Sequence, residues 1–493
     1  MKRIPFSLIL LFPLALIVAC SVTAAPSERE ALVERIGERF DDPDFAQSFW
    51  GVLIESLDSG EIWYERNADR LFIPASNQKI PVAAAAYRAL GPDFTFTTTV
   101  HHTGDIQDGV LRGDLVIHAN GDPTLYDRLQ SHPTAVFERW AAELRELGIR
   151  RIEGNLVGDD SAWERRRTGS GWPHHEITPW YYAEYGPLQF NENYVDLRFI
   201  PPASVDGELV IQPNVESAYF TLVNKVRVVE RGSTSIAMNR PPFSNEITLS
   251  GTVVAGAAPF ERTPTITDPT LFYVTVLKET LEANGIAVDG VPVGLGSLLD
   301  WPHQADDLPE IARHDSPPLR EIIPSFMKRS QNVYAETLVL TMGWKETGFG
   351  TFAAGREVVQ REMAAFGVRS GDYRFADGSG LSRYNLISPR QINAINRGMR
   401  DSELRDLWLD SQAVAGVDGT LRRISRDSPL ANNVRAKTGT LSTVRALSGF
   451  LHTADGEALL FSIINNGSLR GSRAVDEVSH NVLEMLATHG VEN

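Results

Sequence analysis

The chain has 493 residues, of which 42% are hydrophobic and 22% charged. This ordinary globular composition provides enough apolar material for two or three structural units. The formal net charge is −16 at pH 7, and lysine and arginine do not form blocks. Phosphate binding needs concentrated cations, so the charge pattern argues against a nucleic-acid partner.

The N-terminus has the pattern of an export signal. Met1-Lys-Arg precedes an apolar run over residues 4–19 that is too short to span a membrane well, and no later stretch reaches spanning length. The only cysteine, Cys20, looks like the acylated residue of a lipobox. The alternative is ordinary cleavage near residues 23–25. We therefore assign residues 1–25 to the signal and lipobox region, and expect a protein of the periplasm or cell envelope, lipid-anchored if Cys20 is acylated.

The first predicted elements lead to a candidate nucleophile. Residues 50–64 contain two β-rich runs typical of a hairpin. Ser76 then directly precedes a helix predicted over residues 77–90, which contains four consecutive alanines. Within a helix, residues three apart share a face, so the amine of Lys79 can reach the hydroxyl of Ser76. Without further support, the pair could equally be a helix cap and a solvated lysine.

From about residue 97 to 290 the sequence changes to short β-type runs separated by Gly, Asp and Pro turns. This segment is too long for a loop, and we predict two inserted β-rich domains. The expected units are a first domain of 27–96 plus 292–493, an insert of 97–122 plus 215–291, and a second, nested insert of 123–214.

Two further short sequences follow in a meaningful order. Ser330-Gln-Asn332 is an S-x-N sequence, and Lys437-Thr-Gly439 is a K-T-G sequence on a predicted strand. A hairpin and a helix over residues 472–489 follow it. S-x-x-K, S-x-N and K-T-G in this order are typical of serine enzymes that react with D-Ala-D-Ala peptides or penicillin. A second S-x-x-K at Ser325 lies too close to Ser330 to begin an independent helix, and a second S-x-N at Ser479 comes after the K-T-G sequence that should follow it.

Four longer segments extend the match, namely residues 121–125, 377–383, 416–423 and 437–444. With them the chain resembles the class C penicillin-binding proteins, which comprise D-alanyl-D-alanine carboxypeptidases and DD-endopeptidases. The resemblance implies an α/β (α+β) fold: a serine β-lactamase/transpeptidase-like domain, with an antiparallel sheet flanked by helices, interrupted by two inserted β-rich domains. It also implies peptidoglycan peptides as substrates and β-lactams as ligands.

The motif residues can be given roles in an acyl-transfer reaction. Ser76 is the expected nucleophile, and Lys79 its base if burial and the charge of Lys437 lower the pKa of Lys79. Ser330 is expected to relay the proton to the leaving amine, and Asn332 to hold Lys79 or the substrate amide.

The K-T-G strand is expected to bind the substrate carboxylate and to complete the oxyanion hole. The backbone N–H groups of Ser76 and Thr440 are the expected oxyanion donors. The middle residue of S-x-N, Gln331, is expected to matter little. The predicted carboxylate-binding residues are Lys437, Thr438, Gly439 and Thr440.

Other polar residues receive structural interpretations. Asp377 and Asp418 are expected to hold Gly-rich turns. Glu184 is the presumed counterpart of an acidic residue of the family, without an assigned role. His101-His102 and His174-His175 lack a convincing ligand spacing, so we expect exposed loop histidines, no metal and no cofactor.

Two other functions compete with this interpretation. A β-lactamase would use the same acylation machinery with faster attack by water, and an inactive lipoprotein would only bind peptidoglycan. The intact motifs argue against the second alternative. Carboxypeptidase and endopeptidase actions differ only in the leaving group, and the sequence does not choose between them.

Overall fold

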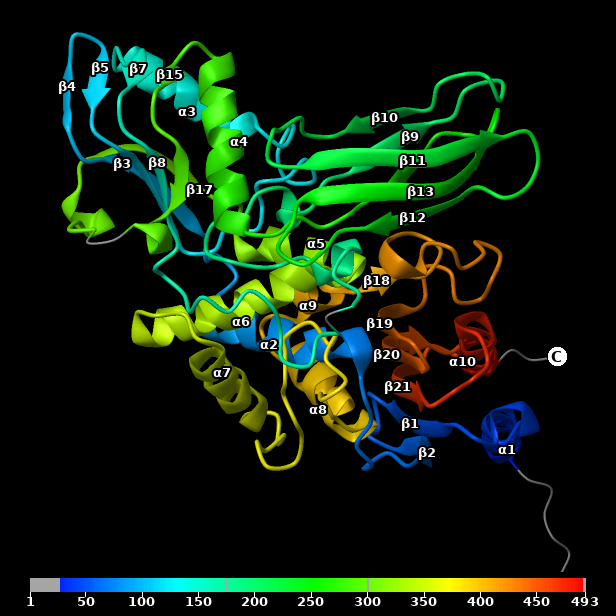
Figure 1. The fold of residues 1–493 in the computed structure, drawn as a ribbon. Helices are drawn as coiled ribbons and strands as arrows, with labels where there is room; N and C mark the ends of the chain where they lie inside the picture. The colour runs from blue at the N-terminus through cyan, green and yellow to red at the C-terminus, as the bar shows by residue number, and fades with distance from the viewer. Residues whose placement is uncertain (1–26, 174, 299–300, 491–493) are drawn as a thin grey trace, which may run out of the picture.

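The computed structural model describes residues 27–173, 175–298 and 301–490. Its lower half in Figure 1 is built on a six-stranded sheet in the order β18-β19-β20-β21-β1-β2, in which every pair is antiparallel. Both ends of the described chain therefore contribute to one sheet, as the predicted hairpin and terminal strands require. The strands are β1 (Phe49–Ser56), β2 (Ile62–Arg66), β18 (Ala413–Val414), β19 (Arg435–Leu441), β20 (Val444–His452) and β21 (Ala458–Asn466).

Helices cover both faces of this sheet because its strands alternate apolar side chains between two cores. In β20, Leu447 and Leu451 belong to the core under α1 (Glu28–Phe40) and α10 (Ser472–Ala487). Ala446 and Phe450 belong to the opposite core, which several helices share. These helices are α2 (Lys79–Ala89), α5 (Leu319–Arg329), α6 (Asn332–Thr347), α7 (Phe352–Ala364), α8 (Pro389–Arg400) and α9 (Arg405–Ser411).

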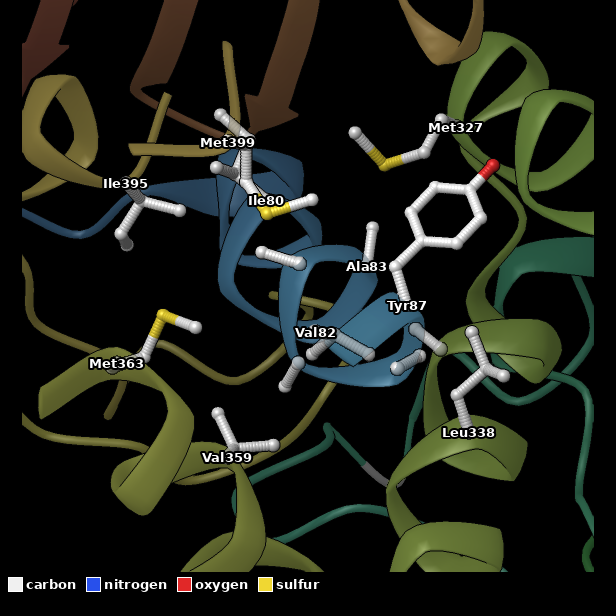
Figure 2. Close-up of a cluster of buried hydrophobic side chains, with 14 of the residues drawn as sticks. Ile80, Val82, Ala83, Tyr87, Met327, Leu338, Val359, Met363, Ile395 and Met399 are labelled. Atoms are coloured by element: carbon white, nitrogen blue, oxygen red, sulfur yellow. The ribbon is translucent and has the colours of Figure 1, made fainter. Parts of the chain in front are cut away.

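Helix α2 is the centre of the second core. All of its residues from Lys79 to Tyr87 are buried, and Figure 2 shows side chains from the surrounding helices directed at it from several sides. Its run of alanines allows the neighbouring helices to pack closely around it. Leu338 of α6, Val359 of α7 and Ile395 of α8 belong to this packing. The element that begins beside Ser76 is thereby fixed on all sides.

The upper half of Figure 1 is an inserted region with four smaller sheets and a core of its own. A five-stranded sheet has the order β16-β8-β6-β3-β17, and a four-stranded sheet has the order β15-β7-β5-β4. Two three-stranded sheets have the orders β10-β9-β14 and β11-β13-β12. The strands are β3 (Thr97–His102), β4 (Asp105–Gln107), β5 (Val110–Arg112), β6 (Leu115–Ala119), β7 (Arg151–Ile152), β8 (Leu156–Asp159), β9 (Leu197–Ile200), β10 (Val210–Pro213), β11 (Thr221–Val229), β12 (Ser235–Asn239), β13 (Glu246–Val254), β14 (Phe260–Arg262), β15 (Ala287–Val288), β16 (Pro292–Gly294) and β17 (Glu310–Asp315).

The inserted region also contains two helices that the sequence analysis missed. These are α3 (Ala135–Glu146) and α4 (Pro269–Ala283), which pack in the core of the β-rich region. The signal was present in α3, where Phe137, Trp140, Ala141 and Leu144 recur at helical spacing and are all buried. The prediction of β-rich inserted domains holds, and the two helices escaped notice because short strands on either side dominated the pattern.

The predicted domain boundaries remain a prediction, and the sheets run across two of them. Strand β8, placed in the nested insert, pairs with β6 and with β16, which were placed in two different units. Strand β17 likewise comes after residue 292 but pairs with β3. The return from the inserted region to the first domain therefore lies after β17, at the start of α5.

The predicted signal and lipobox region, including Cys20, lies outside the described residues. Within residues 27–173, 175–298 and 301–490, no helix is both long enough and apolar enough to cross a membrane.

Candidate active site

Ser76 lies in a 3-10 turn, Ala75–Gln78, that leads directly into α2. The predicted position of Ser76 at the start of a helix is therefore confirmed. Ala75 has a φ of 48°, a left-handed conformation that costs a non-glycine residue on the order of 1–3 kcal/mol. Such strain persists only where the surroundings enforce it, and here the turn is enclosed by two other segments.

Glycines allow both segments to approach the turn. A Cβ at Gly439 of β19 would lie 2.7 Å from the carbonyl oxygen of Pro74 and 3.1 Å from the backbone nitrogen of Ser76. A Cβ at Gly380 would overlap the carbonyl oxygen of Ala75. The glycine of the K-T-G sequence is thus required by the close approach of β19 to the nucleophile.

Lys79 is fully buried, and its Nζ has three oxygen neighbours. These are Ser76 Oγ at 3.0 Å, Asn332 Oδ1 at 2.7 Å and the carbonyl oxygen of Ser379 at 2.6 Å. Burial lowers the pKa of Lys79 to about 7, although Asp377 and Glu336 act in the opposite direction through their charge. The amine therefore exchanges its proton near neutral pH.

The orientation of the Asn332 amide is fixed from its other end. Its Nδ2 donates a hydrogen bond to the carbonyl oxygen of Tyr181 at 2.7 Å, so that Oδ1 faces Lys79. Asn332 is the first residue of α6, and Ser330 is the left-handed residue that ends α5, with a φ of 66°. The S-x-N sequence is thus a tight junction between two helices that line the cleft.

Lys437 is the second buried lysine of the site. Its Nζ donates to Ser330 Oγ at 2.8 Å and to the carbonyl oxygen of Thr438 at 3.0 Å. Burial holds its pKa well below the ordinary value, and the nearby charge of Lys79 lowers it further. The structure therefore brings all three motifs together as two serine–lysine pairs.

Two buried carboxylates that the sequence analysis did not assign to the site support Lys79. Glu336 of α6 accepts hydrogen bonds from the backbone nitrogens of Gly378 at 3.1 Å and Ser379 at 2.8 Å. Burial, together with the charge of Asp377, raises the pKa of Glu336 to about 7. Glu336 thereby holds the loop whose Ser379 carbonyl contacts Lys79. The only sequence signal was a glutamate within the mostly apolar stretch of residues 333–343.

Asp377 and Asp418 act as turn residues, as predicted. Asp377 accepts from the backbone nitrogens of Gly380 and Ser382 and from the indole of Trp172. Asp418 accepts from the backbone nitrogen of Val414 at 2.9 Å, and its second oxygen accepts from Lys328 at 2.7 Å.

Gln331, expected to matter little, instead links the S-x-N junction to the inserted region. The Gln331 side chain is buried and donates to the carboxylate of Glu192, which also pairs with Arg128 and accepts from Tyr194. Burial raises the pKa of Glu192, while Arg128 opposes that shift. The expectation for activity remains a prediction. The side chain of Gln331 contacts a buried charge, whereas Ser330 and Asn332 contact the two lysines.

A cavity of about 710 Å³ opens over Ser76. Ser330, Asn332, Thr438 and Thr440 of the motifs line it. Residues of the inserted region form its opposite wall: Gly171, Pro173, His175, Glu176, Trp180, Tyr181 and Tyr182.

Glu176, rather than Glu184, is the acidic residue of the cavity wall. Its Oε2 accepts from the hydroxyl of Tyr182 at 2.9 Å. Glu184 instead accepts from Thr267 Oγ1 at 2.7 Å and from the Asp268 backbone nitrogen at 3.0 Å, within the inserted region. The resemblance to the family had suggested Glu184, because residues 180–188 were matched to a segment in which an aspartate is commoner at this position.

The histidine prediction was partly wrong. His101 is buried in β3, with one ring nitrogen 2.8 Å from Thr99 Oγ1 and the other 3.0 Å from the Leu308 carbonyl oxygen. His175 is exposed at the cavity wall, as expected, and His174 lies outside the described residues.

Two serine–lysine pairs lie beside one cavity, and the lysine of each pair is buried. This arrangement is typical of serine acyl-transfer hydrolases in which a lysine has the role that histidine has in other serine hydrolases. Comparison with known proteins gives the family. The model of the D-Ala-D-Ala carboxypeptidase 3 (S13) family matches residues 32–489. The chain therefore belongs to this family and is a serine-type D-Ala-D-Ala carboxypeptidase. The comparisons confirm the resemblance to class C penicillin-binding proteins.

Individual relatives can be aligned with this sequence over most of its length. The D-alanyl-D-alanine carboxypeptidase of Actinomadura sp. (strain R39) is 32% identical over 479 residues, which cover 93% of this chain and 85% of the relative. The carboxypeptidase DacB of Haemophilus influenzae is 28% identical over 440 residues, 85% of this chain and 86% of the relative.

The solved structures show the same fold. The crystal structure of penicillin binding protein 4 from H. influenzae has a TM-score of 0.78 at 25% identity, and the match covers 92% of this chain and 99% of that one. The predicted mixed α/β fold with inserted β-rich regions is therefore confirmed.

The close approach at Gly439 generates a test of this geometry. In a Gly439→Ala variant the new methyl group must push β19 away from the Ser76 turn. Since a misplacement near 1 Å can cost on the order of 100-fold in rate, we expect acylation by benzylpenicillin to slow by about 100-fold. Stopped-flow or mass-spectrometric acylation rates measure this.

Gly371→Ala is the matched control, because a Cβ there would meet no atom within 4 Å. Equal acylation rates in Gly439→Ala and Gly371→Ala would show that the contact with the turn does not position the nucleophile.

Proposed function

We propose that this enzyme removes the terminal D-alanine of peptidoglycan stem peptides, and cuts D-Ala cross-links, through an acyl-enzyme on Ser76. The observation that carries the proposal is the set of neighbours around Lys79. Asn332 Oδ1 and the Ser379 carbonyl can only accept hydrogen bonds. A neutral amine satisfies both with its two hydrogens and keeps its lone pair for the hydroxyl of Ser76, 3.0 Å away.

Acylation follows from this arrangement. Ser76 Oγ attacks the carbonyl carbon of the penultimate D-alanine while its proton passes to Lys79 Nζ. The backbone N–H groups of Ser76 and Thr440 are the proposed donors to the resulting oxyanion, and each such donor is typically worth on the order of 10²- to 10³-fold in rate. Collapse of the tetrahedral intermediate breaks the C–N bond and leaves an ester on Ser76.

Ser330 supplies the proton to the leaving amine. Its oxygen already accepts from Lys437 at 2.8 Å, so its own hydrogen is free to be donated. Lys79 then passes the proton that it took from Ser76 to Ser330. Both Lys79 and Ser330 thereby regain their starting protonation states. Water then attacks the ester with Lys79 again as the base, which releases the shortened peptide and restores Ser76.

The terminal carboxylate of the substrate fits the other end of the K-T-G strand. Thr438 and Thr440 line the cavity, and the buried amine of Lys437 lies behind them. Hydroxyl donors favour an anionic group at this place, and the negative charge of that group favours the protonated form of Lys437. We therefore assign Lys437, Thr438, Gly439 and Thr440 to carboxylate binding, with Gly439 contributing through the close approach that it permits.

A covalent test uses benzylpenicillin. Penicillin binding protein 4 from H. influenzae has been crystallised in complex with a β-lactam. For this enzyme we expect an intact-mass increase of one benzylpenicillin in the wild type and none in Ser76→Ala, because only Ser76 can form the ester. Consumption of penicillin without an accumulating adduct would identify a β-lactamase instead, and an adduct on Ser76→Ala would rule out Ser76 as the nucleophile.

The pKa of Lys79 sets the pH dependence. Lys79 must be neutral to accept a proton, so the acylation rate should rise with pH, by about tenfold per unit at low pH, and level off above the pKa of Lys79, near 7. Rates of acylation by a chromogenic β-lactam between pH 5 and 9 measure the midpoint. A rate that falls as pH rises through 7 would contradict a neutral Lys79.

Glu336→Gln is the companion variant for this profile. The carboxylate of Glu336 raises the pKa of Lys79 through its charge, so its removal should move the midpoint to lower pH. A purely structural role of Glu336 would lower the rate at every pH and leave the midpoint in place.

We further propose that the enzyme acts in the periplasm and is anchored by lipid at Cys20. The support is the N-terminal sequence, in which the only cysteine follows the apolar run of an export signal. We expect the wild type to incorporate a labelled fatty acid in bacterial cells and a Cys20→Ser variant to incorporate none, with the variant released from the membrane fraction. A labelled Cys20→Ser variant would place the anchor elsewhere.

A further inference from the structure

We propose that a second cavity beside the active site binds the leaving half of a cross-linked peptide through its carboxylates. This inference rests on the proposed function, because it concerns the group that departs when the acyl-enzyme forms. It goes beyond that function by placing the leaving peptide in the second cavity and by proposing that the carboxylates of this peptide are recognised there.

The second cavity has a volume of about 690 Å³ and shares three wall residues with the catalytic cavity: Trp180, Arg329 and Thr420. The two cavities therefore lie side by side. Alternate residues of the S-x-N sequence face them, with Ser330 and Asn332 lining the catalytic cavity and Gln331 lining the second.

The second cavity adjoins the leaving-group side of the reaction. Thr438, where the terminal carboxylate is proposed to bind, donates a hydrogen bond from its Oγ1 to Thr420 Oγ1 at 2.8 Å, and Thr420 borders both cavities. Leu441, at the end of β19, and Ser442 after it border the catalytic cavity together with Arg383. We place the acyl half of the substrate along this part of the cavity, so that whatever extends beyond the cut bond points toward the second cavity.

The charges around the second cavity favour an anionic occupant. Four cations line it, and two of them have carboxylate partners: Arg128 with Glu192, and Lys328 with Asp418. The other two, Arg329 and Arg422, form no ion pair within the part of the chain that the structure describes.

The polar contacts of these two arginines are limited. Arg422 donates to the carbonyl oxygen of Gly419 at 2.9 Å, and Asp127 lies close enough to Arg329 to feel its charge. Guanidinium groups with free donors bind carboxylates well, often through two parallel hydrogen bonds.

The size of the leaving group decides whether the second cavity is used. Free D-alanine, released in the carboxypeptidase reaction, is a single amino acid that the carboxylate-binding end of the catalytic cavity can hold. The amine released from a cross-link carries a second stem peptide with carboxylates of its own. Only this larger leaving group can reach Arg422, so the second cavity distinguishes the two activities.

The experiment compares two substrates in the full-length enzyme: a monomeric peptide ending in D-Ala-D-Ala and a D-Ala cross-linked dimer. The value measured is the ratio of kcat/KM for the dimer to kcat/KM for the monomer. Because a hydrogen bond to a charged group is lost, we expect Arg422→Gln to lower this ratio by about tenfold, and Arg422→Lys to restore part of it.

Arg423→Gln is the matched control. Arg423 is the next residue, is also exposed and lines neither cavity, so its variant should leave the ratio unchanged. A dimer in which the leaving-half carboxylates are amidated, except the one beside the cut bond, provides the complementary change: wild type and Arg422→Gln should cleave it equally.

The outcomes separate this inference from the proposed function. An unchanged ratio in Arg422→Gln, an equal loss in Arg423→Gln, or a wild type that cleaves the monomer but never the dimer would overturn the inference while the acyl-enzyme stands. A wild type that neither cleaves the monomer nor forms a penicillin adduct would overturn the proposed function itself.

Discussion

The burial of two lysines side by side is the constraint on which the site depends. Lys79 and Lys437 are both removed from water, which lowers the pKa of each, and the charge of Lys79 lowers the pKa of Lys437 further. Each amine therefore needs oxygen acceptors placed at hydrogen-bond distance, and these come from four separate parts of the chain: the 3-10 turn before α2, the α5–α6 junction, the loop near Ser379 and β19. The fold places these four parts of the chain next to one another around the two lysines.

Close backbone approach is the second requirement, and it explains the residue types in the motifs. The strained Ala75 is held between Gly380 and Gly439, and neither glycine leaves room for a side chain. Below the turn, α2 is locked by helices on all sides (Figure 2). The strain and the rigid core act together to keep Ser76 Oγ 3.0 Å from Lys79 Nζ, as the proposed roles of these two residues require.

The inserted region completes the site as well as covering it. Tyr181 orients the Asn332 amide, Glu192 holds Gln331, and Trp172 donates to Asp377. An aromatic cluster that includes Trp163 and Tyr185 of the insert and Leu340 of α6 fixes the contact between the two halves. Loss of the insert would therefore disturb Lys79 through its partners, as well as removing a wall of the cavity.

The sequence by itself determined the local elements and the candidate reacting groups, because the hairpin, the alanine-rich helix and the ordered motifs each lie within a short segment. The α3 helix was also readable and was overlooked. Only the tertiary structure decided that Glu336 supports Lys79, that Glu176 and not Glu184 borders the cavity, and that Gln331 faces Glu192. These relations join residues far apart in the chain, and a side chain's partner across such a gap depends on packing that local pattern does not encode.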